Sequence, residues 1–179
     1  MRALLAAFDG PEPRPATFAL SNVQFETFLE PVILAQAAKP LLVLHALTAM
    51  ALLGATTHLV IVKALRWRGR PKERLEALYS RLIAPLFVGA FILGLAMYPH
   101  FRVDVRARFL DSQQPWASNL FDFKEHMAAL GLPLAVALFF LARRGPASRP
   151  VADLFAVVLW AIVAWAAISG LIITSVRGV

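Results

Sequence analysis

Four apolar runs, separated by short polar segments, dominate the pattern of this chain. They lie at about 41–65, 82–98, 124–142 and 154–176, and about 20 apolar residues suffice for a helix to cross a bilayer. The second run is short, so its helix is expected to begin earlier, near Leu75, and the third helix near Asn119. The pattern therefore predicts an all-α, polytopic membrane protein, with residues 41–179 forming an up-down bundle of four transmembrane helices.

The first 40 residues form a separate N-terminal segment. Prolines at 11, 13 and 15 exclude a regular helix in its first half. From Ser21 onward, apolar residues recur on one helical stripe. This stripe predicts an N-terminal helix lying in the membrane interface. The alternative is a helix that packs on the end of the bundle.

Most of the candidate chemistry lies between Tyr98 and His126, in the long connection between the second and third runs. The predicted outer loop covers residues 99–123. Within it, apolar and charged residues alternate from Phe101 to Phe109, which predicts an extended segment with two faces. We expect its apolar side to lie over the mouth of the bundle.

The composition supports the membrane prediction and narrows the chemistry. The chain is 59% hydrophobic and only 16% charged, against about 45–50% and about 25% in soluble domains. Its net charge of +7 is expected from cationic loops of a membrane protein, so no nucleic-acid partner is predicted. Because there is no cysteine, disulfides, thiolate metal sites and covalently attached haem are excluded within the chain.

The distribution of cations predicts the orientation. Residues 63–81 carry seven Lys and Arg, and 143–149 carry three, on the same side of the predicted bundle. Dense cations in short loops mark the cytoplasmic side. The prediction is therefore an inner-membrane protein of a bacterium with both termini in the periplasm. The four cations between Tyr98 and His126 count against this orientation.

Three histidines are expected at similar depth near the outer face. His45 lies just inside the first span, His100 just beyond the second, and His126 near the start of the third. His58 lies about 20 Å deeper than His45 and points elsewhere. Ionisable groups in a span suggest a functional site. The structural alternatives are a hydrogen bond between helices for His45 and contact with interfacial water for His100 and His126.

Neighbouring residues extend this candidate site. Asp122 lies four residues before His126, where its carboxylate could fix the imidazole tautomer or cap the helix instead. Arg102 and Arg106 have the fork geometry that suits carboxylates such as haem propionates. The alternative for these arginines is contact with lipid headgroups.

Three functions fit these residues. The first is a cytochrome b-like electron-transfer subunit, in which His45 and His126, or His100 in place of either, bind haem b and Arg102 and Arg106 hold its propionates. The second is a copper or zinc site made by His45, His100, His126 and Asp122. The third is a non-catalytic accessory subunit of a larger membrane complex.

The partners expected from these functions are the lipid bilayer, other membrane subunits and a periplasmic redox protein. The layout is loosely similar to that of four-helix membrane cytochrome b subunits, and no motif carries individual residues across. No catalytic motif is present, so enzymatic activity stays open.

Overall fold

The computed structural model describes residues 37–144 and 146–176, and every regular element in these ranges is a helix. The long helices are α2 (Ala38–Trp67), α3 (Glu73–His100), α5 (Pro115–Leu141) and α6 (Arg149–Val176). Short helices lie between them: η2 (Phe101–Leu110), α4 (Asp111–Gln113) and η3 (Pro146–Ser148). The predicted interfacial helix from Ser21 onward falls on residues outside the described ranges.

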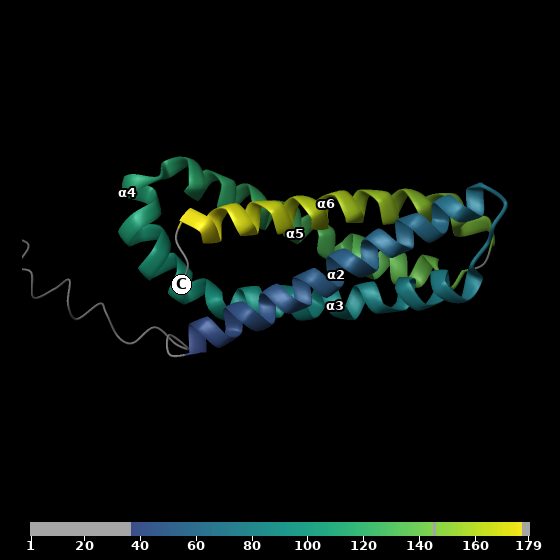
Figure 1. Cartoon of the computed structure of the whole chain (residues 1–179), viewed down its shortest axis with the longest axis horizontal. Coiled ribbons are helices and arrows are strands. Elements are labelled where there is room, and N and C mark those ends of the chain that lie inside the picture. The colour runs from purple at the N-terminus through teal and green to yellow at the C-terminus, as the bar shows by residue number, and fades with distance from the viewer. Residues whose placement is uncertain (1–36, 145, 177–179) are drawn as a thin grey trace, which may run out of the picture. The chain divides into compact units, whose positions relative to one another are not determined.

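The four long helices form the predicted up-down bundle. The chain reverses direction at each connection, so that the 68–72 turn and the short helix η3 lie at one end (Figure 1). Helix α2 packs against α3 and α6, and α5 packs against the same two helices, which gives a closed ring of four. All four are long and apolar enough to cross a membrane. The fold class expected from the sequence is confirmed.

The turn between α2 and α3 follows from one glycine. Gly69 has a φ of 76°, a left-handed conformation that residues with a Cβ rarely adopt. Its N–H donates to the Arg66 carbonyl, and the Arg70 N–H donates to the Leu65 carbonyl. This Schellman pattern satisfies the last carbonyls of α2, and it reverses the chain within a few residues.

The prediction of an extended segment at Phe101–Phe109 is wrong, because these residues are helical. The chain continues from α3 through the π-helical η2 into α4, and α5 already begins at Pro115. The charges alternate along the segment, but they also recur four residues apart: His100 with Asp104, and Asp104 with Arg108. Pairs at this spacing stabilise helices. We call this helical connection, residues 101–114, the hook.

The hook ends sharply because of Pro115. Proline disfavours a helical conformation in the preceding residue, and Gln114 has φ −140° and ψ 62°. Proline is also well suited to the first turn of a helix, where its missing N–H is not needed. The chain therefore turns at Gln114 and re-enters the bundle as α5, while Figure 1 shows the hook beyond the ends of the other helices.

Two apolar clusters hold the helices together. The larger runs through the ring, and each long helix contributes to it a side chain with no exposed surface: Leu59, Ile83, Leu138 and Leu159. The smaller joins the hook to α5 and α6 through Val105, Leu110, Ala117, Phe121 and Ile173. Large apolar side chains also cover the outside of the bundle, with Leu47, Ile92, Leu130 and Leu171 more than half exposed. An apolar exterior around an apolar interior suits a lipid surrounding.

Close packing of α5 makes Gly131 sensitive to substitution. An added Cβ would lie 2.6 Å from Phe87 Cζ and 3.2 Å from Ile162 Cγ2, so Gly131→Ala is expected to destabilise the bundle by about 1–3 kcal/mol through overpacking. Gly54→Ala is the matched control, because no atom lies within 4 Å of its added Cβ. SDS titration followed by circular dichroism measures both; equal midpoints would contradict the packing.

Candidate functional site

His45 forms a link between α2 and α3 in the half of the bundle that is nearer to the hook. Its half-buried ring has Nδ1 2.9 Å from the carbonyl oxygen of Ala90. A carbonyl only accepts hydrogen bonds, so Nδ1 carries the proton and Nε2 keeps its lone pair. The interhelical hydrogen bond considered from the sequence is therefore present. It also leaves Nε2 available as a ligand donor.

Gly94 also lies beside this ring. It lies one turn beyond Ala90 on α3, and a Cβ added there would be 3.5 Å from Cε1 of His45. The ring therefore lies beside α3 at Gly94 as well as at Ala90.

Lys124 is a further candidate residue, which the pattern of histidines along the sequence does not single out. It extends from α5 into the bundle, where its Cε would lie 3.9 Å from a Cβ on Gly170 of α6. Its Nζ is 5.2 Å from the centre of the Phe121 ring. Among the described residues, no carboxylate lies within 4 Å of Nζ. A charged group inside an apolar span is the signal that could have identified it.

His126 does not share the interior with His45. Its exposed ring donates from Nδ1 to the Asp122 carbonyl oxygen, 2.6 Å away on the same helix. Two residues along a helix correspond to a rotation of about 200°. Because Lys124 faces into the bundle, His126 faces outward. The expected pairing of His45 with His126 is therefore not found in this arrangement.

His100 and Arg102 belong to the junction of α3 with the hook. His100 Nδ1 lies 2.9 Å from Asp104 Oδ2, and the other oxygen of that carboxylate is 2.5 Å from Arg108 Nη1. Arg102 is exposed. His100 and Arg108 thus flank the carboxylate of Asp104.

Arg106 and Asp122 bind one another. Nη1 and Nη2 of the arginine lie 2.6 Å and 2.9 Å from the two carboxylate oxygens, and Nε lies 3.4 Å from Asp111. A two-pronged pair of this kind fixes orientation as well as charge. It attaches the hook to α5. Asp122 thus serves neither of the roles weighed from the sequence, and Arg106 already has a carboxylate in the place predicted for a propionate.

The expected three-histidine metal site is not assembled. Across residues 37–144 and 146–176, no three His, Cys, Asp or Glu side chains lie where they could share a metal ion. His45, His100 and His126 each contact a different partner, as described above. His58, the fourth histidine, is exposed, donates to the Gly54 carbonyl at 2.8 Å and stacks on Tyr79.

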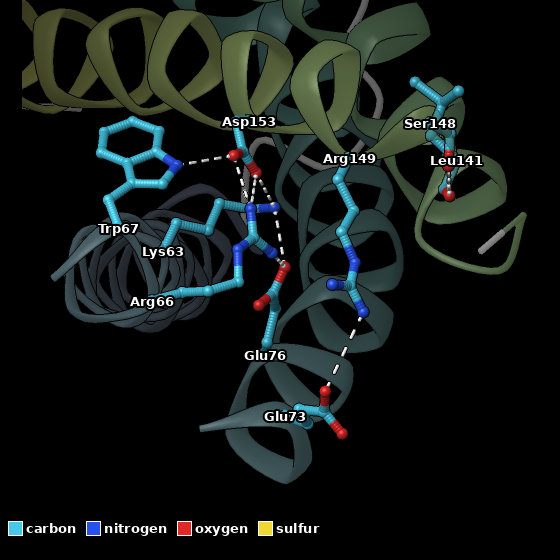
Figure 2. A network of polar contacts seen from close by, with 9 residues as sticks. All are labelled: Lys63, Arg66, Trp67, Glu73, Glu76, Leu141, Ser148, Arg149 and Asp153. Atoms are coloured by element: carbon cyan, nitrogen blue, oxygen red, sulfur yellow. Dashed lines mark hydrogen bonds and ion pairs between the residues drawn. The ribbon is translucent and has the colours of Figure 1, made fainter. Parts of the chain in front are cut away.

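A second polar cluster lies at the opposite, cation-rich end of the bundle. Figure 2 shows Lys63, Arg66 and Trp67 of α2 converging on Asp153 of α6, with Glu76 of α3 beside them. Lys63 Nζ lies 2.8 Å from Asp153 Oδ1 and 3.1 Å from Glu76 Oε1. Arg66 Nη2 is 2.5 Å from Asp153 Oδ2, and its Nη1 donates to Glu76. We call these five residues the ion cluster.

Lys63 is buried inside the ion cluster. Its place near the end of an apolar run suggests that it extends toward water. In the structure only 3% of the residue is exposed, because carboxylates from two other helices meet it inside the bundle. The cluster joins three helices, and its charges satisfy one another.

Comparison with known proteins found no relative of this chain. No family model matches the chain, and neither do any curated protein or any solved structure. The ion cluster and the Arg106–Asp122 pair are satisfied contacts that suit a structural role. His45 of α2 and Lys124 of α5 are the remaining candidates: the first offers a nitrogen lone pair to a ligand and the second a positive charge.

Proposed function

We propose that this integral membrane protein holds haem b in the outer half of its bundle, between His45 and Lys124, and transfers electrons. The observation that carries the proposal is the orientation of His45. Its Nδ1 proton is engaged by Ala90, so Nε2 is the free nitrogen, and a neutral imidazole nitrogen is a usual axial donor to haem iron. A hydrogen bond on the other ring nitrogen is also typical of metal-binding histidines.

Lys124 supports the same proposal through its charge. An unpaired cation within a bundle needs an anionic or polar partner, and haem carries two carboxylates. A haem at this site would therefore find both an axial donor and a partner for an acidic group. The described residues fit one histidine ligand rather than two, because His126 is exposed on the far face of α5. This departs from the bis-histidine arrangement expected from the sequence.

The test is the reduced-minus-oxidised absorbance spectrum of the detergent-purified protein, with metal analysis of the same sample. Sharp α and Soret bands, with about one haem per chain, are expected. Stoichiometric copper or zinc without these bands would reject haem and favour a copper- or zinc-binding protein. A blank result in both would reject a cofactor and favour an accessory subunit of a larger membrane complex.

The proposed location is the inner membrane of a bacterium, with the hook in the periplasm and the ion cluster facing the cytoplasm. The chain has no cysteine, so single cysteines can report the orientation without background. Gln113→Cys in the hook and Ala147→Cys in the α5–α6 turn are both exposed positions. A membrane-impermeant maleimide should label the first in spheroplasts and the second only after permeabilisation. The reverse pattern would contradict this orientation.

A further inference from the structure

A surface groove lies beside the ion cluster, between the end of α2 and the start of α6. Its volume is about 540 Å³. It is lined by Arg66, Trp67, Arg149, Pro150, Asp153, Leu154 and Val157. The groove thus combines cationic and indole groups with apolar side chains of α6.

The cationic side of the groove has one guanidinium available for a ligand. Arg66 is already bound by Asp153 and Glu76. Arg149 is different: its side chain is half exposed, and its pair with Glu73 is loose at 3.9 Å, with the glutamate itself 78% exposed. Solvated pairs of this kind contribute little, so Arg149 can exchange this partner for an anion.

The charge around the groove favours an anion strongly. Residues 63–81 and 143–153 contain ten Lys and Arg against three carboxylates. Two of those carboxylates, Glu76 and Asp153, are engaged inside the ion cluster. The remaining surface at this end is therefore cationic, and it attracts anionic groups.

The apolar side of the groove continues along α6 toward the middle of the bundle. Leu154 is 60% exposed, and Val157 lies one turn further on with 38% exposed. Trp67, also largely exposed, is a residue type enriched at the level of lipid headgroups. An apolar strip below a cationic group matches a molecule with an anionic head and an apolar tail.

We propose that this groove binds an anionic phospholipid, with Arg149 on the headgroup phosphate and the acyl chain along Leu154 and Val157. Basic pockets between transmembrane helices suit such headgroups. Free phosphate would meet the same guanidinium but would make no use of the apolar strip. The lipid is therefore the occupant that accounts for both sides of the groove.

The experiment is native mass spectrometry of the full chain in detergent, titrated with phosphatidylglycerol or phosphatidylcholine of the same acyl composition. Phosphatidylglycerol is expected to bind more tightly. Arg149→Gln should weaken its binding about fivefold, the equivalent of about 1 kcal/mol for one cation near a headgroup. Arg149→Lys should keep most of the affinity, because the positive charge remains. Arg144→Gln is the matched control: it removes one charge from an exposed residue at the same end that does not line the groove.

Two results would overturn the proposal. Equal weakening by Arg149→Gln and Arg144→Gln would mean that the lipid responds to overall charge and not to the groove. Displacement of bound phosphatidylglycerol by millimolar inorganic phosphate, with the same dependence on Arg149, would make free phosphate the ligand. Circular dichroism of each variant checks that the helices are intact, and Arg149→Lys separates lost charge from lost fold.

Discussion

Asp153→Asn should destabilise the bundle by about 3–5 kcal/mol, the usual cost of removing one partner from a buried ion pair. The carboxylate accepts from Lys63, Arg66 and Trp67 of α2. Asparagine keeps the volume but removes the charge, so two cations would then share Glu76 alone. The free energy of unfolding in SDS, followed by circular dichroism, measures the loss.

Two further variants distinguish a loss of charge balance in the ion cluster from a general sensitivity of the bundle to the loss of any carboxylate. Glu73→Gln removes a carboxylate from the same end, but its side chain is 78% exposed and its pair is 3.9 Å long, so a change within about 0.5 kcal/mol is expected. Adding Lys63→Met to Asp153→Asn restores the balance of charge and should recover part of the loss. If Asp153→Asn matched Glu73→Gln, the ion cluster would not hold the helices together.

His45→Ala should abolish haem retention, while His126→Ala should leave it near the wild-type level. The sequence alone predicts equal losses from the two, because both histidines lie near the outer face. The structure separates them: one ring lies half-buried against α3 and the other is exposed on α5. Haem per chain, measured by pyridine haemochrome after purification, gives the comparison.

The fold must stay intact for this comparison to be informative. His45→Ala also removes the hydrogen bond to Ala90, a loss of about 1 kcal/mol, so the helical circular dichroism of the variant should resemble that of the wild type. Equal haem loss in the His126 variant would contradict a single histidine ligand and favour haem binding by both His45 and His126.

The bundle itself could be predicted from the sequence because it depends on apolar length alone. Runs such as 154–176, with no charged residue, have few alternatives to a membrane span. The ends of the helices were less predictable, since charged residues at Glu73 and Arg149 extend them beyond the apolar runs. The prediction of an extended segment at 101–109 failed for a related reason: the alternating charges there fit both a strand and i,i+4 pairs of a helix.

The candidate site could be predicted only in part. His45 stands out as an ionisable residue within an apolar run, and the structure places it against the neighbouring helix. The partners that engage Arg106 and Lys63 come from other helices, and spacing along one helix does not reveal which side chains meet across a bundle. Lys124 is hard to identify from the sequence because its neighbours Asp122 and His126 form the more evident pair. Those two residues share one face of α5, and Lys124 lies on the opposite face, toward the interior of the bundle.

The most direct test of the central claim is imidazole rescue of His45→Gly, read from the reduced-minus-oxidised spectrum. The claim is that the Nε2 of this residue is the axial donor to a haem inside the bundle. Purified without imidazole, the variant should lack the α and Soret bands of the wild type, and haem added with millimolar imidazole should restore them. Bands of wild-type intensity in the variant before imidazole is added, or no haem in the wild-type protein, would contradict the account.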